Sequence, residues 1–149
     1  MKRNISYLFP LLLLFATGCF KSNTNPNPVV LPSGTFSGPF VVIHLNSLTG
    51  KQDTSTANVI LTMSLTTGYS VTGDTSTLQA GSKGSYVADG QYISFTDQTL
   101  PAGTTVVKPP NVKKNHLNGL YQYVYDGTNF QFYSTSADTI GYTYVLKKN

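Results

Sequence analysis

The sequence predicts an all-β domain, a small antiparallel up-and-down barrel of about eight strands. Three observations indicate this fold: many aromatic and β-branched residues, apolar residues that alternate along the chain, and Asp-Gly turns between strand-like runs. The chain contains ten tyrosines, eight phenylalanines and thirteen glycines. A β-sandwich is the alternative. The hairpin order of the strands favours the barrel, because closure leaves no exposed edge.

The N-terminal residues precede this domain. Lys2 and Arg3 are followed by an apolar stretch that ends at three small residues, 16–18, which is the layout of a secretory signal peptide. About eleven apolar-region residues span roughly 16 Å as a helix, whereas the hydrocarbon core of a membrane is about 30 Å thick. We therefore expect residues 1–18 to be a signal peptide that is removed.

The segment "ATGC", residues 16–19, resembles the lipobox of bacterial lipoproteins. The resemblance implies a diacylglyceryl thioether on Cys19, cleavage before Cys19 and an acylated new N-terminus. Phe20 and Lys21 follow, where an aspartate would tend to retain such a protein at the inner membrane, so the resemblance favours the outer membrane of the cell envelope. A plain secretion signal with a leftover cysteine is the alternative.

Residues 19–32 form the expected lipid-bearing cysteine and flexible tether, and residues 33–149 form the domain. The tether is rich in Asn and Pro and has almost no charge, so it cannot bury enough apolar surface to order itself. The domain contains no cysteine, so its stability must come from packing. After cleavage, eight lysines face six aspartates, which is too weak a balance to indicate a nucleic-acid partner.

The first strands are expected in "GTFSGPFVVIHL", "ANVILTMSLT" and "GYSVTGD". Alternation is clearest in the second segment, which predicts one inward face. That face comprises Ala57, Val59, Leu61, Met63 and Leu65.

Two predicted hairpins follow, in "GSYVADGQYISF" and "GLYQYVYDGTNFQF". A two-residue loop at Asp89-Gly90 would place Tyr86 opposite Ile93. In the second hairpin, a two- or four-residue loop pairs Tyr125 with Phe130. One face of this hairpin then gathers Tyr121, Tyr123, Tyr125, Phe130 and Phe132. A last strand is expected in "IGYTYVLKK".

The segments "GTFSGPF", "GSYVADGQYISFTD" and "YTYVLKK" resemble the short lipocalin-like lipoproteins of diderm bacteria over most of residues 33–149. Gly34-Thr35-Phe36 stands where lipocalins carry Gly-x-Trp. The chain has no tryptophan, and no arginine follows Arg3. The resemblance implies a barrel, and the family is largely without assigned activity.

Enzyme chemistry is not expected, and no catalytic residue, metal ligand or cofactor is predicted. The six aspartates fall in segments that read as turns or strand ends, where carboxylates bond to the backbone. The two histidines, His44 and His116, are far apart and have no evident third partner. No nucleophile motif or zinc set occurs.

The candidate binding region combines a long loop with tyrosines. The segment 99–119 is much longer than the other links, includes a possible brief strand at 104–107, and is read as either a solvated excursion or a lid for an anionic group. Its expected ligand residues are Lys113, Lys114 and His116. Tyr121 and Tyr123 follow directly and are expected beneath the loop, and the candidate tyrosines Tyr142 and Tyr144 share one face of the last strand.

Two classes of function stay open. The first is a membrane-anchored barrel that binds a small apolar or amphipathic ligand. The second is a structural or accessory subunit of an envelope assembly. A hollow interior would favour the first class, and a solid core with an exposed aromatic face the second.

Overall fold

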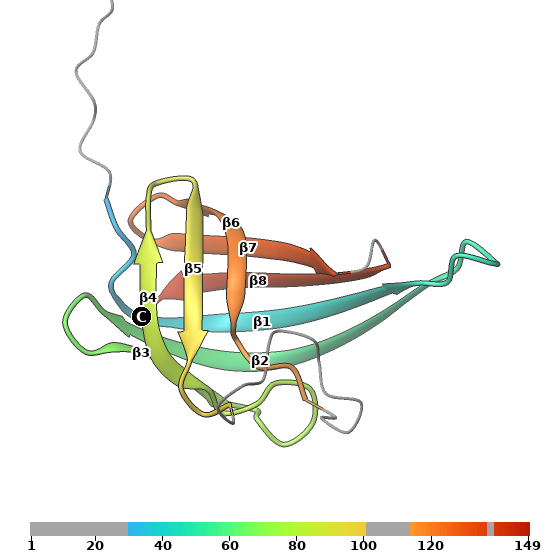
Figure 1. Ribbon diagram of the computed structural model, residues 1–149, viewed down its shortest axis with the longest axis horizontal. Helices are drawn as coiled ribbons and strands as arrows, with labels where there is room; N and C mark the ends of the chain where they lie inside the picture. The colour runs from blue at the N-terminus through green and yellow to red at the C-terminus, as the bar shows by residue number, and fades with distance from the viewer. Residues whose placement is uncertain (1–29, 101–113, 137–138) are drawn as a thin grey trace, which may run out of the picture.

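The computed structural model describes residues 30–100, 114–136 and 139–149. They form a closed barrel of eight antiparallel strands in sequence order, in which the last strand pairs with the first (Figure 1). The strands are β1 (Gly34–Leu45), β2 (Gln52–Ser64), β3 (Gly68–Gly73), β4 (Lys83–Ala88), β5 (Tyr92–Asp97), β6 (Gly119–Tyr125), β7 (Asn129–Ser136) and β8 (Ile140–Lys148). The predicted up-and-down barrel is confirmed, and the sandwich alternative is wrong. The described part of the chain contains no helix long and apolar enough to span a membrane.

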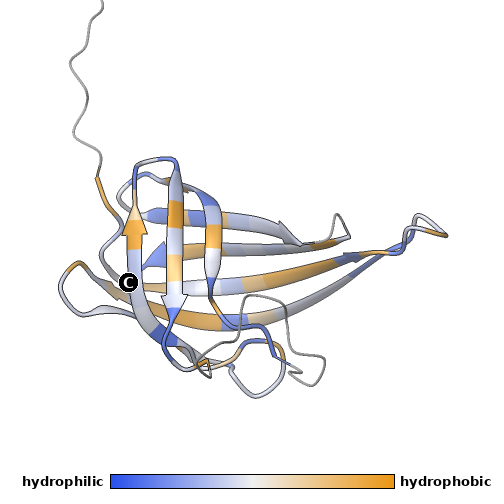
Figure 2. Ribbon diagram, viewed as in Figure 1, coloured by the Kyte–Doolittle hydropathy of each residue, from blue (hydrophilic) through white to orange (hydrophobic). Residues whose placement is uncertain are grey.

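The alternation of β2 sets the inward face of that strand. Ala57, Val59, Leu61 and Met63 are buried, and the residues between them are exposed. Leu65 was expected on the same face but is exposed, because it lies beyond the end of β2 in the turn to β3. Hydrophobic and polar positions alternate in the same way along the front strands in Figure 2.

The register of the β6–β7 hairpin is as predicted, with Tyr125 opposite Phe130. The predicted register of the β4–β5 hairpin is wrong by two residues, because Tyr86 lies opposite Phe95 rather than Ile93. The Asp89 side chain explains the longer turn, since its Oδ1 accepts hydrogen bonds from the N–H groups of Gln91 (2.9 Å) and Tyr92 (2.7 Å). A shift of two residues keeps every side chain on its face, so the inward set is unchanged.

The interior is filled with aromatic rings. The Tyr144 ring stacks on Phe40 and on Phe132, with centroids 4.4 Å apart in both pairs, and Phe95 packs edge-on against Tyr69 and Tyr121. These rings and most of their neighbours are almost completely inaccessible to water. A side chain that lined an open cavity would remain accessible, so the described core side chains pack against other protein atoms.

The paired strands β1 and β2 extend beyond the rest of the barrel as a long arm (Figure 1). The arm ends in a turn in which Asn46 Oδ1 accepts hydrogen bonds from the N–H groups of Leu48 and Thr49. At the other end, Pro32 is buried and its carbonyl accepts a hydrogen bond from the Tyr86 hydroxyl (2.9 Å). The segment that leads to the N-terminus therefore meets the barrel beside β4.

Candidate functional site

One end of the barrel, here called the loop end, is covered by the β3–β4 and β5–β6 connections. Residues 101–113, including Lys113 and the possible strand at 104–107, lie outside the described residues. The described remainder forms a parallel bridge between Gln79 and Asn115. The Ala80 N–H donates to the Asn115 carbonyl, and the Asn115 N–H donates to the Leu78 carbonyl, both at 2.8 Å. Two connections far apart in sequence thus close over the core together.

The Tyr144 hydroxyl at this end is bonded inside the protein. It donates to Gln79 Oε1 (2.7 Å), and Asn115 Nδ2 donates to it (3.4 Å). Gln79 is completely buried, and its amide nitrogen donates to the Ala80 carbonyl (3.2 Å). Burial raises the pKa of Tyr144 well above its ordinary value, and the neighbouring Tyr121 adds to this effect. This neutral hydroxyl is part of a buried polar network.

Leu117 of the β5–β6 connection belongs to the buried core. Its side chain is completely buried, its N–H donates to Ser82 Oγ (3.1 Å), and its carbonyl accepts a hydrogen bond from the Tyr69 hydroxyl. Burial, with a smaller contribution from the charge of Asp97, raises the pKa of Tyr69 far above its ordinary value. Leu117 therefore acts as a plug whose backbone is also tied to the barrel.

Asp97 and His116 form a pair beside this plug. His116 Nδ1 lies 2.7 Å from Asp97 Oδ2, and the Thr99 hydroxyl donates to Asp97 Oδ1 (2.6 Å). The Asp97 side chain is inaccessible to water, whereas His116 is partly exposed. Burial by itself would raise the pKa of Asp97. Hydrogen bonds from Thr99, His116 and Ser82 outweigh burial and lower that pKa.

The tyrosines expected to line a binding region are brought together only in part. The rings of Tyr121 and Tyr144 lie 6.1 Å apart in the core, and Tyr142 is half-buried and stacks on Phe40 at 6.4 Å. Tyr123 is also buried, but on the side of the Asp-Gly turns.

The two candidate ligand residues of the loop that the structure describes, Lys114 and His116, bond to other protein groups. Lys114 Nζ donates to the Thr75 carbonyl (2.6 Å), and His116 is bonded to Asp97. The described loop end therefore presents a closed polar cover above the aromatic core.

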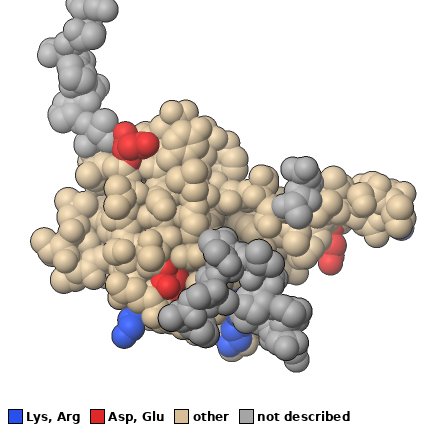
Figure 3. Space-filling model, in the orientation of Figure 1, with Lys and Arg blue, Asp and Glu red and all other residues tan. Residues whose placement is uncertain are grey.

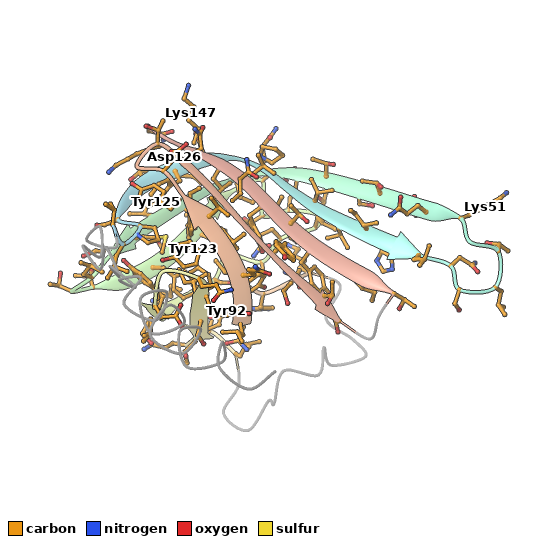
Figure 4. All side chains as sticks on the ribbon, turned by 90° about the horizontal axis from the view of Figure 1, so that it is seen from above. Lys51, Tyr92, Tyr123, Tyr125, Asp126 and Lys147 are labelled. Carbon is orange, nitrogen blue, oxygen red and sulfur yellow. The ribbon has the colours of Figure 1, made fainter. Side chains whose placement is uncertain are left out.

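The opposite end, here called the turn end, carries both Asp-Gly turns. The Tyr125 hydroxyl donates to the Gly127 carbonyl (3.0 Å). The Tyr123 hydroxyl is buried near the Gly90 backbone, and it forms no hydrogen bond of acceptable geometry within the part of the chain that the structure describes. The Gly90 backbone acts to lower the Tyr123 pKa. Burial is the larger effect and raises the Tyr123 pKa. Figure 4 shows Tyr123 and Tyr125 toward the end marked by Asp126, far from Lys51 at the tip of the arm.

An uncharged face on the outside of the barrel was not identified from the sequence as a candidate site. It consists of the outward side chains of β4 to β7, with Val87, Leu120 and Val124 exposed by 74%, 60% and 71%. Tyr92 and Tyr133 are also exposed, at 40% and 49%. Figure 3 shows a broad surface without charged groups across the centre of β4 to β6. Its sequence signal is that the outward positions of these strands carry no charged residue except Lys83, at the start of β4.

The described residues contain no cluster of three or more His, Cys, Asp or Glu side chains. An open hollow at the arm is lined by His44, Lys51 and Asp53, among others. These groups lie on an exposed hairpin and supply no enclosed site.

The fold and these two ends define a class: an all-β protein with a closed eight-stranded antiparallel barrel and an aromatic core. Comparison with protein-family models, curated protein sequences and solved structures gives no significant match.

Proposed function

We propose that this protein is a non-enzymatic envelope lipoprotein whose barrel is an accessory module that binds protein through its outer surface. The observation that carries the proposal is the contrast between interior and exterior. The described interior is packed with aromatic rings, whereas the uncharged face leaves five large apolar or aromatic side chains in contact with water. Contiguous exposed apolar side chains are typical of interaction surfaces.

The lipid anchor is the second part of the proposal. The lipobox-like "ATGC" supports a thioether on Cys19, and the presence of Phe20 and Lys21 after it, in place of an aspartate, favours an outer-membrane location. Two or three acyl chains hold a protein firmly, because each buried methylene contributes about 0.8 kcal/mol. Pro32 meets the barrel beside β4, so a tether of about twelve residues, at most about 40 Å long, would hold the domain close to the membrane.

The anchor is tested by Cys19→Ser. The variant should accumulate as an unprocessed precursor and lose labelling by a fatty-acid analogue. Labelling of the variant equal to that of the wild type would remove the anchor from the proposal.

The accessory role is tested by native mass spectrometry of the full protein extracted from its own membrane. We expect the barrel to carry a second polypeptide and no small molecule beyond its acyl chains. A stoichiometric small molecule without any bound polypeptide would contradict the proposal.

Binding of a small amphipathic ligand is a second candidate, favoured by one observation. The buried Tyr123 hydroxyl has no hydrogen-bond partner among the described residues, and a buried polar group without a partner costs about 1–3 kcal/mol unless something satisfies it. A fluorescent fatty acid should then bind the wild-type protein, and Tyr123→Ala should weaken that binding at any salt concentration. Lys114→Ala, at the opposite loop end where Lys114 Nζ donates to the Thr75 carbonyl, should leave that binding unchanged. Absence of binding to the wild-type protein would eliminate this candidate.

A further inference from the structure

The uncharged face is continuous across neighbouring strands. In one row, Val87 on β4 lies opposite Ser94 on β5, which lies opposite Leu120 on β6. In the next row, Tyr92 lies opposite Gln122, and Gln122 opposite Tyr133 on β7. The Tyr133 hydroxyl donates to Gln122 Oε1, so the phenol reaches sideways over the sheet rather than standing out from it. The face therefore presents a low surface of aliphatic groups, phenol rings and amides.

This composition fits a protein partner. The centres of protein interfaces are poor in Lys, Asp and Glu and rich in Tyr, and their energy comes from a few large side chains. Single exposed apolar residues are ordinary, but here they are neighbours in a paired sheet. Polar groups between them, such as Gln122 and Ser94, can form hydrogen bonds across a contact.

Charges at the border of the face indicate which partner fits. Lys83 begins β4 and Asp89 follows its end, and both side chains are exposed. Six residues of strand separate them by roughly 20 Å. One end of β4 is therefore positive and the other negative. Asp126 lies at the negative end too, but Lys147 of β8 is near it, so Asp89 is the main negative group beside the face.

A second copy of the chain satisfies this pattern in one orientation. A twofold axis that lies in the contact plane, perpendicular to the β4 strands, makes the contact self-complementary and places Lys83 of each copy near Asp89 of the other. A twofold axis parallel to the strands would instead bring like charges together. We propose that the uncharged face is a homodimer interface in which the β4 strands of the two copies run in opposite directions; this inference rests on the proposed protein-binding role of the face.

Sedimentation velocity of residues 30–149, whose eight strands close on one another, tests the inference. The wild-type barrel should show a concentration-dependent dimer. Leu120→Asp, at the centre of the face, should weaken dimerisation at least tenfold, because it places a charge in the contact. Leu65→Asp is the matched control, since Leu65 is equally exposed but lies in the β2–β3 turn, and it should dimerise like the wild type. Unchanged melting temperatures would show that both variants are folded.

The orientation is tested by charge. Lys83→Asp should weaken the dimer several-fold at low ionic strength and much less at high salt, because exposed charges are screened within about 8 Å at physiological ionic strength. Adding Asp89→Asn should restore part of the loss, since asparagine keeps the side-chain oxygen that holds the turn. Lys83→Asp with wild-type affinity at low salt would overturn the antiparallel arrangement.

A photo-crosslinking residue at Leu120 of the full chain in intact cells separates the two proposals. A product of twice the subunit mass supports the homodimer. A product with a different protein, together with a monomeric barrel in sedimentation, overturns the homodimer and leaves the accessory role standing. A monomeric barrel and no crosslinked protein would overturn both.

Discussion

The two ends of the barrel are built from the same residue type but closed by different kinds of contact. At the loop end, Tyr69 bonds to a residue 48 positions away and Tyr144 to one 65 positions away. At the turn end, Tyr125 bonds to a residue two positions away, and Asp126 Oδ1 accepts from N–H groups two and three positions ahead. Tyr86 differs, because it reaches Pro32 from the turn end.

The difference in sequence separation indicates that the hydrogen bonds of the loop end depend on the complete fold more than those of the turn end do. Local turns form with little help from distant residues, whereas each of these loop-end bonds joins a strand to a connection far away in the sequence. Substitutions at the loop end should therefore lower the free energy of unfolding more than substitutions at the turn end. The predictions below test this ranking in order of expected size.

The largest effect is expected for Leu117→Ala. Removing the completely buried plug should lower the free energy of unfolding by about 3 kcal/mol, through lost burial and the cavity left in the aromatic core. Urea unfolding measures the loss. Leu65→Ala is the control, because truncation of the exposed Leu65 side chain should cost less than about 0.5 kcal/mol. Equal losses for the two leucines would show that the plug is not packed as described.

The next largest effect is expected for Asp97→Asn. It should lower the free energy of unfolding by about 2 kcal/mol, because it removes the charged acceptor that Thr99 and His116 contact. Its pH dependence is specific. The lowered pKa of Asp97 means that the unfolded chain binds more protons, so this stability is present above the ordinary carboxyl pKa and is lost as pH falls through the folded value. The difference between wild type and variant should shrink in acid. A difference independent of pH would contradict the role of the carboxylate.

A matched pair of tyrosine variants compares the ends directly. Tyr144→Phe should cost about 1–2 kcal/mol, because the buried Gln79 amide loses its partner. Tyr123→Phe should be neutral or stabilising, because its buried hydroxyl has no partner to lose in residues 30–100, 114–136 and 139–149. Thermal unfolding of both variants provides the test. A cost for Tyr123→Phe comparable to that of Tyr144→Phe would indicate that something satisfies the Tyr123 hydroxyl.

The smallest effect is expected for Gly127→Ala at the turn end. Gly127 has φ +95°, which a side chain tolerates poorly, but no atom lies within 4 Å of the place a Cβ would take. Backbone strain alone should cost about 1 kcal/mol. Gly50 lies in the exposed turn of the arm with φ +65°, and its Cβ site is equally open. Gly50→Ala should therefore lower the free energy of unfolding by no more than Gly127→Ala does. A loss larger than that of Asp97→Asn would reverse the proposed ranking of the two ends.

The sequence predicted the barrel because alternation and turn signals are local. Ala57 to Met63 alternate with a period of two, and that pattern decides which face of β2 is buried. The inward set of β6 and β7 followed from the same period and was confirmed by the pairing of Tyr125 with Phe130. The β4–β5 register was missed because the Asp89 side chain bonds to two N–H groups and lengthens the turn, which the Asp-Gly pair alone does not reveal.

The sequence by itself determined the strand positions, their inward faces and the lipobox-like segment, because each depends on residues close together in the chain. The burial of Gln79, the Asp97–His116 pair and the plug at Leu117 were decided only by the tertiary structure. Their partners lie 19 to 65 positions away, and no local pattern specifies which polar groups will meet once the barrel closes. The uncharged face lies between these cases: its residues alternate visibly, but only closure of the barrel makes them neighbours on one exposed surface.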